Sequence, residues 1–325
     1  MVFQHYVGVL LVLLMITAVG IYFGKKVTNA TDFSTSGRAA GTGIVAGSLI
    51  GTLAGGASTI GTAQLAFSYG FSAWWFTMGG GIGLIVMALS FAKPLYCSGA
   101  STIAQIFERE YGRKVAITTA LLMSIGTFLS ITSQLLSGIS LITSVSEISS
   151  PAAAMPVFIL RHLPPLWGGI ILAALLAALI GTGAGLALGM SSMFCGDIIK
   201  PCCKTSLSDA VLLRVQRRII VVILASAGLF TFGNMGSVIL SWSFMSMGLR
   251  GAVAFAPLLF CLYAPGRADR RFVLSAIIAG PLVVLAGNFV LPSEIDPLFP
   301  GISVGLLLVA AGAASSPKDS MEWKN

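Results

Sequence analysis

The sequence predicts an all-α, polytopic membrane protein with about nine transmembrane helices. Hydrophobic residues make up 56% of the 325 residues and charged residues only 9%, whereas a soluble domain carries about 25% charged residues. Apolar runs recur along the chain, most of them near the ~20 residues that a helix needs to cross a bilayer. The 38 glycines suit membrane helices that pack closely. This composition excludes a soluble enzyme, a disordered chain and a nucleic-acid-binding module.

The predicted spans follow one another with short polar connections. They cover residues 3–23, 43–69, 74–96, 115–145, 166–194, 219–232, 238–263, 272–291 and 301–314. The first span is expected to be retained rather than cleaved as a signal peptide. Its apolar run exceeds the ~7–15 residues of a signal-peptide core, and no basic residue precedes it.

Positive charge gives the predicted orientation. If the nine spans alternate in direction, every Lys and Arg except Arg161 and Arg250 lies on one side. Basic residues mark the cytoplasmic side of a membrane protein. We therefore expect a multi-pass protein of the cell membrane, with its N-terminus outside and its C-terminus in the cytoplasm. No Asp or Glu lies deep in a span, which argues against proton coupling.

Residues for covalent chemistry are scarce, so we expect no enzyme activity. His5 and His162 are the two histidines, and they complete no catalytic or metal-binding motif. The five cysteines all fall near the predicted cytoplasmic face, where thiols stay reduced. Cys202 and Cys203 are either palmitoylated beside the membrane or an ordinary reduced pair.

The second predicted span carries the most informative pattern, GSLIGTLAGGASTIG from Gly47 to Gly61. The adjacent Gly55 and Gly56 each weaken a helix by about 1 kcal/mol relative to alanine. A helix that unwinds at membrane depth must direct its freed carbonyls into a cavity or toward a ligand. Two interpretations remain: a broken helix whose carbonyls bind an alkali cation, or a continuous helix whose glycines pack tightly.

The fifth predicted span contains a second polar position at about half depth. Thr182 stands among small residues, from Ala177 to Gly185. Its hydroxyl either bonds back to the carbonyl one turn earlier, as most membrane threonines do, or faces another helix or an ion.

Four segments occur in an order that resembles a known family. They are Thr31–Phe33 with Ser36–Arg38, Gly56–Gly61 running to Tyr69–Gly70, Ser101–Gln105 with Arg109–Gly112, and Leu163–Pro165 followed by Ala173–Ala178 and Asp197–Ile198. Together they are similar to the sodium/solute symporter family of glucose, proline, pantothenate and sialic-acid carriers. The resemblance covers about residues 31–115 and 152–200.

The resemblance implies a fold of two inverted five-helix repeats, with Na⁺ between the first repeat helix, which is broken, and the eighth. By position it assigns the cation to the backbone carbonyls of Gly51 and Ala54. On the fifth span it assigns Ala178, through its carbonyl, together with Gly181 and Thr182. The family commonly has hydroxyl residues at the last two positions, so Gly181 leaves one ligand missing.

Two residues are candidates for contact with substrate. Ser58 matches a position that contacts substrate in sugar carriers of the family, and Gln134 is a polar residue within the fourth span. The alternative for both is a structural hydrogen bond between helices.

The resemblance also implies that about four central helices are missing, between the fourth span and residues 151–165. We expect a broken-helix, inverted-repeat transporter bundle that is incomplete and forms a single transmembrane domain over residues 1–325. Residues 1–145 form the first-repeat part, 146–165 an outer loop at the apparent deletion, and 166–325 the second-repeat remainder and C-terminal helices. Either the remaining spans collapse into the gap, or a homo-oligomer or a complementing subunit fills it.

The function that these features predict is a sodium-coupled symporter that imports a small organic solute by alternating access. Na⁺ is the coupling ion, and the expected partners are the solute and the lipid bilayer, with no nucleic acid. The alternative is a transport-incompetent remnant, or a structural or regulatory membrane protein of the same family.

Overall fold

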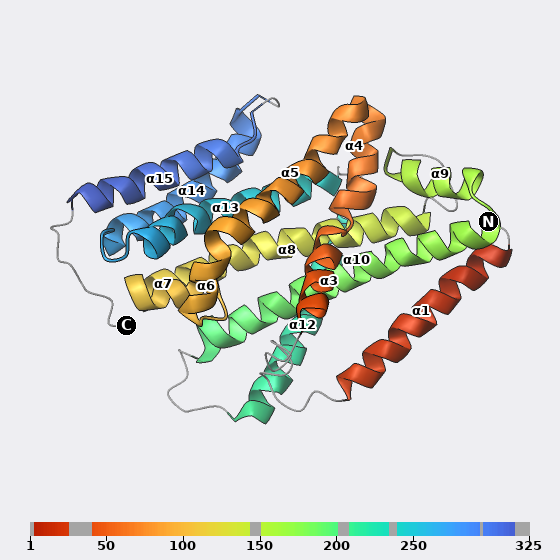
Figure 1. Ribbon diagram of the computed structural model, residues 1–325, viewed down its shortest axis with the longest axis horizontal. Helices are drawn as coiled ribbons and strands as arrows, with labels where there is room; N and C mark the ends of the chain where they lie inside the picture. Colours follow the sequence, from red (N-terminus) through yellow and green to blue (C-terminus); the bar gives the residue numbers. More distant parts are fainter. Residues whose placement is uncertain are drawn as a thin grey trace. The chain divides into compact units, whose positions relative to one another are not determined.

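The computed structural model describes residues 3–25, 41–143, 151–200, 208–233, 239–292 and 295–315. These residues form helices joined by turns, and no strand occurs among them (Figure 1). The all-α prediction is confirmed. Two features named above, the segment Thr31–Arg38 and the pair Cys202–Cys203, lie outside the described residues.

The helices follow the predicted spans closely. In the first part of the chain they are α1 (Phe3–Gly24), α3 (Thr42–Leu53), the π-helical turn η2 (Ala57–Gly61), α4 (Thr62–Tyr69), η3 (Gly70–Ala73), α5 (Trp74–Val86), η4 (Met87–Phe91), α6 (Ala92–Ser98), α7 (Ile103–Tyr111) and α8 (Arg113–Thr143). After them come η5 (Pro151–Ala153), α9 (Ala154–His162), α10 (Pro165–Met193), η6 (Phe194–Ile199), α12 (Asp209–Phe232), α13 (Ile239–Tyr263), α14 (Arg270–Val290) and α15 (Leu298–Ser315).

Seven of the described helices are long and apolar enough to cross a membrane, so the count of nine is not confirmed. One difference arises at the second span, where α3 has 12 residues and the remainder joins the next span in a 42-residue stretch, Ala57–Ser98. That stretch turns at Gly70, whose φ of 66° favours glycine. The other difference is that α12 is not among the seven helices. It begins ten residues before the predicted span 219–232, and the added part includes charged residues.

Residues 146–165 contain more structure than the predicted outer loop. Helix α9 covers Ala154–His162, and Pro156 and Ile159 on it are buried. Ile159 belongs to a hydrophobic cluster that also includes Leu136 and Leu172. Tertiary packing therefore favours a helix that residue composition alone did not indicate. The predicted division at residues 145 and 165 stays a prediction.

Contacts between residues divide the chain into two compact units. The first contains Met1–Gly83, Ser130–Ser191 and Leu207–Ser243, and the second contains Leu84–Leu129, Ser192–Ser206 and Phe244–Asn325. In the first unit, Ile60 just after the helix break is fully buried against Leu179 of α10 and Ile239 of α13. The turn η2 is thus packed against α10 and α13.

The second unit has its own apolar core. Phe107 of the amphipathic helix α7 is fully buried with Val115 of α8, Val253 of α13 and Val273 of α14. Helices α14 and α15 lie side by side, and their approach depends on small residues (Figure 1). A Cβ atom on Gly301 would lie 2.9 Å from the carbonyl oxygen of Gly280, so a larger residue would force the two helices apart.

Candidate functional site

The chain leaves helical geometry at the glycine pair of the second predicted span. Helix α3 ends at Leu53, and Ala54 has φ −77° and ψ 31°, outside the helical range. Helical backbone resumes at Ala57 as a π-helical turn. Of the two interpretations left open above, the structure has the broken helix.

Glycine is required at the break because two other helices approach it. A Cβ atom on Gly56 would overlap the Ser137 hydroxyl of α8 and lie 2.5 Å from Leu179 Cδ2 of α10. A Cβ atom on Gly55 would lie 3.0 Å from Gln134 Nε2. By contrast, a Cβ atom on Gly47 would have no described atom within 4 Å. The glycines therefore serve close packing at the break, and not along the whole of α3.

Gln134 satisfies a backbone group that the break frees. The Gly56 N–H donates to Gln134 Oε1 over 2.7 Å, and both groups are buried. A buried N–H without a partner would cost about 1–3 kcal/mol. Gln134 therefore stabilises the unwound segment, which matches the structural alternative given for it above.

Hydroxyl groups on the far side of the break lie against its carbonyl oxygens. Ser58 Oγ lies within hydrogen-bond distance of the carbonyl oxygens of Leu53 and, at 3.1 Å, Gly55. Thr59 Oγ1 donates to the Gly55 carbonyl over 2.9 Å. The predicted substrate residue Ser58 thus lies at the break, with its hydroxyl directed at backbone oxygens.

Thr182 connects α10 to the broken helix. Its Oγ1 donates to the carbonyl oxygen of Gly51 over 3.1 Å, and its side chain is only 7% exposed. The hydroxyl is therefore not directed back at its own helix. Two of the five predicted cation ligands, which lie 131 positions apart in sequence, are brought together.

The other three predicted ligands lie on the same two segments. Ala54 is the first residue of the break, three positions after Gly51. Ala178 precedes Thr182 by one helical turn, so both occupy one face of α10. Gly181 is exposed, and a Cβ atom on it would meet no described atom within 4 Å.

The oxygens at this place are neutral and hard, and they suit an alkali cation. A hydroxyl has lone pairs as well as a proton, so Thr182 Oγ1 can rotate to face a cation that the Gly51 carbonyl also binds. The C-terminal end of α3 points into the break, and helix C-termini carry partial negative charge. Among the described residues, no group of three or more His, Cys, Asp and Glu side chains gathers around a point that could hold a metal.

Helix α8 carries a row of three polar residues, Ser133, Gln134 and Ser137. Only Gln134 was predicted from the sequence to be functional. Ser133 Oγ lies 3.1 Å from the carbonyl oxygen of Ile239 and 2.8 Å from Ser243 Oγ. Ser137 is fully buried one turn later and packs against Gly56. The signal was present, because three polar residues at spacings of one, three and four in an apolar span indicate a face directed at other helices.

Two further segments of the resemblance meet in the second unit. Gln105 Nε2 of α7 donates to Asp197 Oδ1 of η6 over 3.0 Å, and Asp197 is buried. Thr102 caps α7 by accepting from the Gln105 N–H over 3.2 Å. The motif residues around Gln105 therefore hold the end of the α10–η6 helix.

Comparisons with known proteins decide the family. The sequence profile of the sodium:solute symporter family matches residues 33–160 and 145–280, which together make up more than half of the chain. The chain belongs to the sodium:solute symporter family. The symporter resemblance is thereby confirmed, and a chain of this length fits a member with a shortened central part.

Structural comparison agrees with the symporter assignment. The chain is similar to a solved structure described as the substrate-bound outward-open state of a Na⁺-coupled sialic acid symporter with a novel Na⁺ site. The TM-score is 0.75 at 13% identity, over 97% of each chain. At this identity the likeness shows the fold alone. A search among curated proteins finds no match to the sequence. Family and fold together indicate a multi-pass membrane protein built for sodium-coupled transport.

Proposed function

We propose that this symporter-family protein imports a small organic solute together with Na⁺ by alternating access. The observation that carries the proposal is the contact between Thr182 Oγ1 and the Gly51 carbonyl at 3.1 Å. In the proposed site the Gly51 and Ala54 carbonyls bind the cation from the broken helix. The Thr182 hydroxyl and the Ala178 carbonyl bind it from α10, with Gly181 beside them.

A cation in this position would couple two helices that are far apart in the sequence. Its ligands on α3 and on α10 must hold their spacing while the cation is bound, because each supplies part of the coordination. A ligand shifts a conformational equilibrium only by its different affinities for the two states. Na⁺ that bridges α3 and α10 favours the state in which these helices are close, and so prepares the protein for the solute.

The break also offers groups for the solute. Gln134 uses Oε1 on the Gly56 N–H, which leaves its Nε2 as a donor beside Gly55. Ser58 lies on the next turn, with a hydroxyl that can exchange a backbone oxygen for a solute oxygen. In our proposal these two residues form the solute side of the site. The binding of Na⁺ and of solute would then share one unwound segment.

The proposed location of the protein is the cell membrane. The protein resides in the cell membrane with its N-terminus outside and its C-terminus in the cytoplasm, as the distribution of basic residues predicts. A second copy or a complementing subunit covers the part where family helices are missing.

Binding of Na⁺ alone tests the cation site without knowledge of the solute. Thermal unfolding of the purified full chain is measured in NaCl and in KCl at equal ionic strength. At 100 times its Kd, Na⁺ stabilises a protein by about 2.7 kcal/mol. We expect Thr182→Val to abolish this stabilisation and Thr182→Ser to keep it.

Thr231 offers a matched control. It is buried on α12, and its Oγ1 donates to the Ala227 carbonyl of its own helix over 2.6 Å. Thr231→Val should keep the Na⁺ effect. If Thr182→Val responds to Na⁺ as the wild type does, the proposed site is wrong.

Uptake into proteoliposomes tests transport itself. A Na⁺ gradient is applied across vesicles that contain the full chain, and uptake of labelled sugars, amino acids and carboxylic acids is compared with a K⁺ gradient. Na⁺-dependent uptake of one solute class, lost in Thr182→Val, is expected. Na⁺ binding without any such uptake would favour the alternative of a remnant or a regulatory membrane protein.

A further inference from the structure

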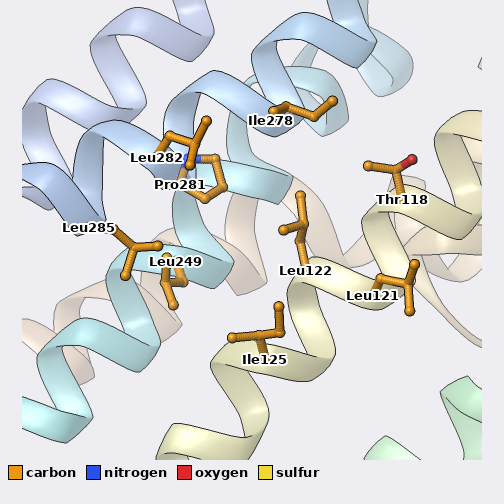
Figure 2. Close-up of a pocket in the computed structure, with 9 residues that line it drawn as sticks. All are labelled: Thr118, Leu121, Leu122, Ile125, Leu249, Ile278, Pro281, Leu282 and Leu285. Atoms are coloured by element: carbon orange, nitrogen blue, oxygen red, sulfur yellow. The ribbon is translucent and has the colours of Figure 1, made fainter.

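An apolar groove of about 240 Å³ lies on the second unit, away from the broken helix in sequence. Its walls come from three helices, α8, α13 and α14 (Figure 2). The principal side chains are Leu121, Leu122 and Ile125 of α8, Leu249 of α13, and Pro281 and Leu282 of α14. The volume is below the ~300–1,000 Å³ of pockets that enclose a small molecule. The groove therefore suits part of a longer apolar ligand.

The groove offers that ligand no hydrogen bond. Among the described residues that line it, Thr118 has the one polar side chain, and Thr118 Oγ1 donates its proton to the Lys114 carbonyl over 2.9 Å. The rim is exposed, with Ile125 52% and Leu282 57% accessible. All three helices are long and apolar enough to cross a membrane, so these accessible side chains face hydrocarbon. The molecules available to fill the groove are thus lipid chains.

Basic residues stand at one end of the groove. Lys114 and Arg271 are both exposed, near the first residues of α8 and α14. Lys114 precedes the groove residue Thr118 by four positions and Arg271 precedes Ile278 by seven, which is about 6 Å and about 10 Å along a helix. Arg270 Nη1 would lie 3.5 Å from a Cβ atom on Gly112, so the starts of α8 and α14 are adjacent.

Nearby carboxylates are engaged elsewhere and leave the positive charge in excess. Asp269 Oδ1 accepts from the Arg271 backbone N–H over 2.7 Å and caps α14. Glu110 Oε1 accepts from the Gly266 backbone N–H. Both carboxylates are thus directed at the backbone. The side chains of Lys114 and Arg271 remain close to the level of lipid phosphates.

We propose that the groove and the basic residues together bind one anionic phospholipid. Its phosphate lies against Lys114 and Arg271, and one acyl chain lies along Leu122 between α8 and α14. The separation of about 6–10 Å along the helices between the basic residues and the groove matches the depth of the headgroup region plus the first chain carbons, because headgroups occupy roughly 5–7 Å on each side of the hydrocarbon. The positive charge of Lys114 and Arg271 favours an anionic headgroup, and the groove determines where the acyl chain lies.

Lipid binding to the purified full chain tests the proposal. Affinities for phosphatidylglycerol and phosphatidylcholine with identical chains are measured in detergent by native mass spectrometry. Each basic residue near an anionic surface contributes roughly fivefold in affinity. We expect Lys114→Gln with Arg271→Gln to weaken phosphatidylglycerol binding about 30-fold and to leave phosphatidylcholine binding unchanged.

Two matched controls separate a specific site from general effects. Arg214→Gln with Arg218→Gln removes two exposed cations from α12 and should leave phosphatidylglycerol affinity unchanged. Leu282→Trp fills the groove and should weaken binding of both lipids. Val221→Trp, at a 66% exposed apolar position of α12, should weaken neither. Gel filtration of each variant shows that it is folded.

Three results would overturn the proposal. Equal affinities for the two lipids would mean that the basic residues do not select the headgroup. An equal loss in the α12 double variant would mean that net charge alone attracts the lipid. Displacement of phosphatidylglycerol by millimolar inorganic phosphate would show a free-phosphate site in place of a lipid site.

Discussion

Gly181 is the residue at which this chain departs most clearly from the cation-site pattern that it otherwise follows. It precedes Thr182 on α10, where the family resemblance leads one to expect a second hydroxyl. A side chain there would meet no described atom within 4 Å. The position therefore has room for a hydroxyl, and the proposed cation site has one oxygen ligand fewer without any change in packing.

Gly181→Ser is expected to strengthen Na⁺ binding. A hydrogen bond or ligand contact to a charged group contributes about 1.5–3 kcal/mol, so the Na⁺ affinity should rise at least tenfold. The measurement is the Na⁺ dependence of thermal unfolding in wild type and variant. Gly185 is one turn further along α10, also exposed and open, and Gly185→Ser should not change the affinity. Equal effects of the two serines would contradict the assigned ligand position.

For single residues, the sequence predicts which residue types are important better than it predicts which groups they contact. The sequence shows Thr182 as a polar oxygen among small residues, but the hydroxyl of most membrane threonines bonds back to the carbonyl of its own helix. The choice depends on whether the Gly51 carbonyl comes within reach, and that is decided by packing between α3 and α10. Ser58 shows the same limit, because its contacts with Leu53 and Gly55 depend on the unwound geometry of the break.

The broken helix is the element on which sequence and structure agree best. Two adjacent glycines at membrane depth predicted a weak point, and α3 ends one residue before Ala54. What the glycines could not reveal is the identity of the helices that fill the space. Ser137 and Leu179 contact Gly56 from α8 and α10, and such contacts join residues more than 80 positions apart. Helix α12 shows the converse, since hydropathy predicted only residues 219–232, and the charged first turns extend the helix back to Asp209.

Substitution of alanine along this element should separate packing from helix propensity. Gly56→Ala places a methyl group against the Ser137 hydroxyl, and overpacking typically costs about 1–3 kcal/mol. Gly47→Ala lies in open space within α3 and should stabilise by up to about 1 kcal/mol. Thermal unfolding of both variants measures the difference. The pair Gly56→Ala with Ser137→Ala should recover part of the loss, and similar melting temperatures for all three would refute the contact.

On the scale of the whole molecule, composition predicts a membrane protein, and the distribution of basic residues predicts its orientation in the membrane. The net charge is +8, and the basic residues gather on one side if the nine predicted spans alternate. The number of crossings was harder to predict, because hydropathy does not show that Ala57–Ser98 turns at Gly70. A 42-residue helical run would measure about 63 Å, twice the ~30 Å of hydrocarbon, so the turn is needed to keep both halves in the membrane.

The helical run from Trp74 to Ser98 allows the predicted orientation to be tested directly. It contains 25 residues in α5, η4 and α6, or about 37 Å of helix, enough to separate its two ends by the full hydrocarbon thickness. Ser72 and Cys97 are exposed near opposite ends. In a variant with the other cysteines changed to serine, an impermeant maleimide should label Cys97 only in inside-out vesicles. Ser72→Cys, combined with Cys97→Ser, should be labelled only in intact cells. Reversed labelling would place the N-terminus in the cytoplasm, and labelling of both from one side would mean that this run does not cross the membrane.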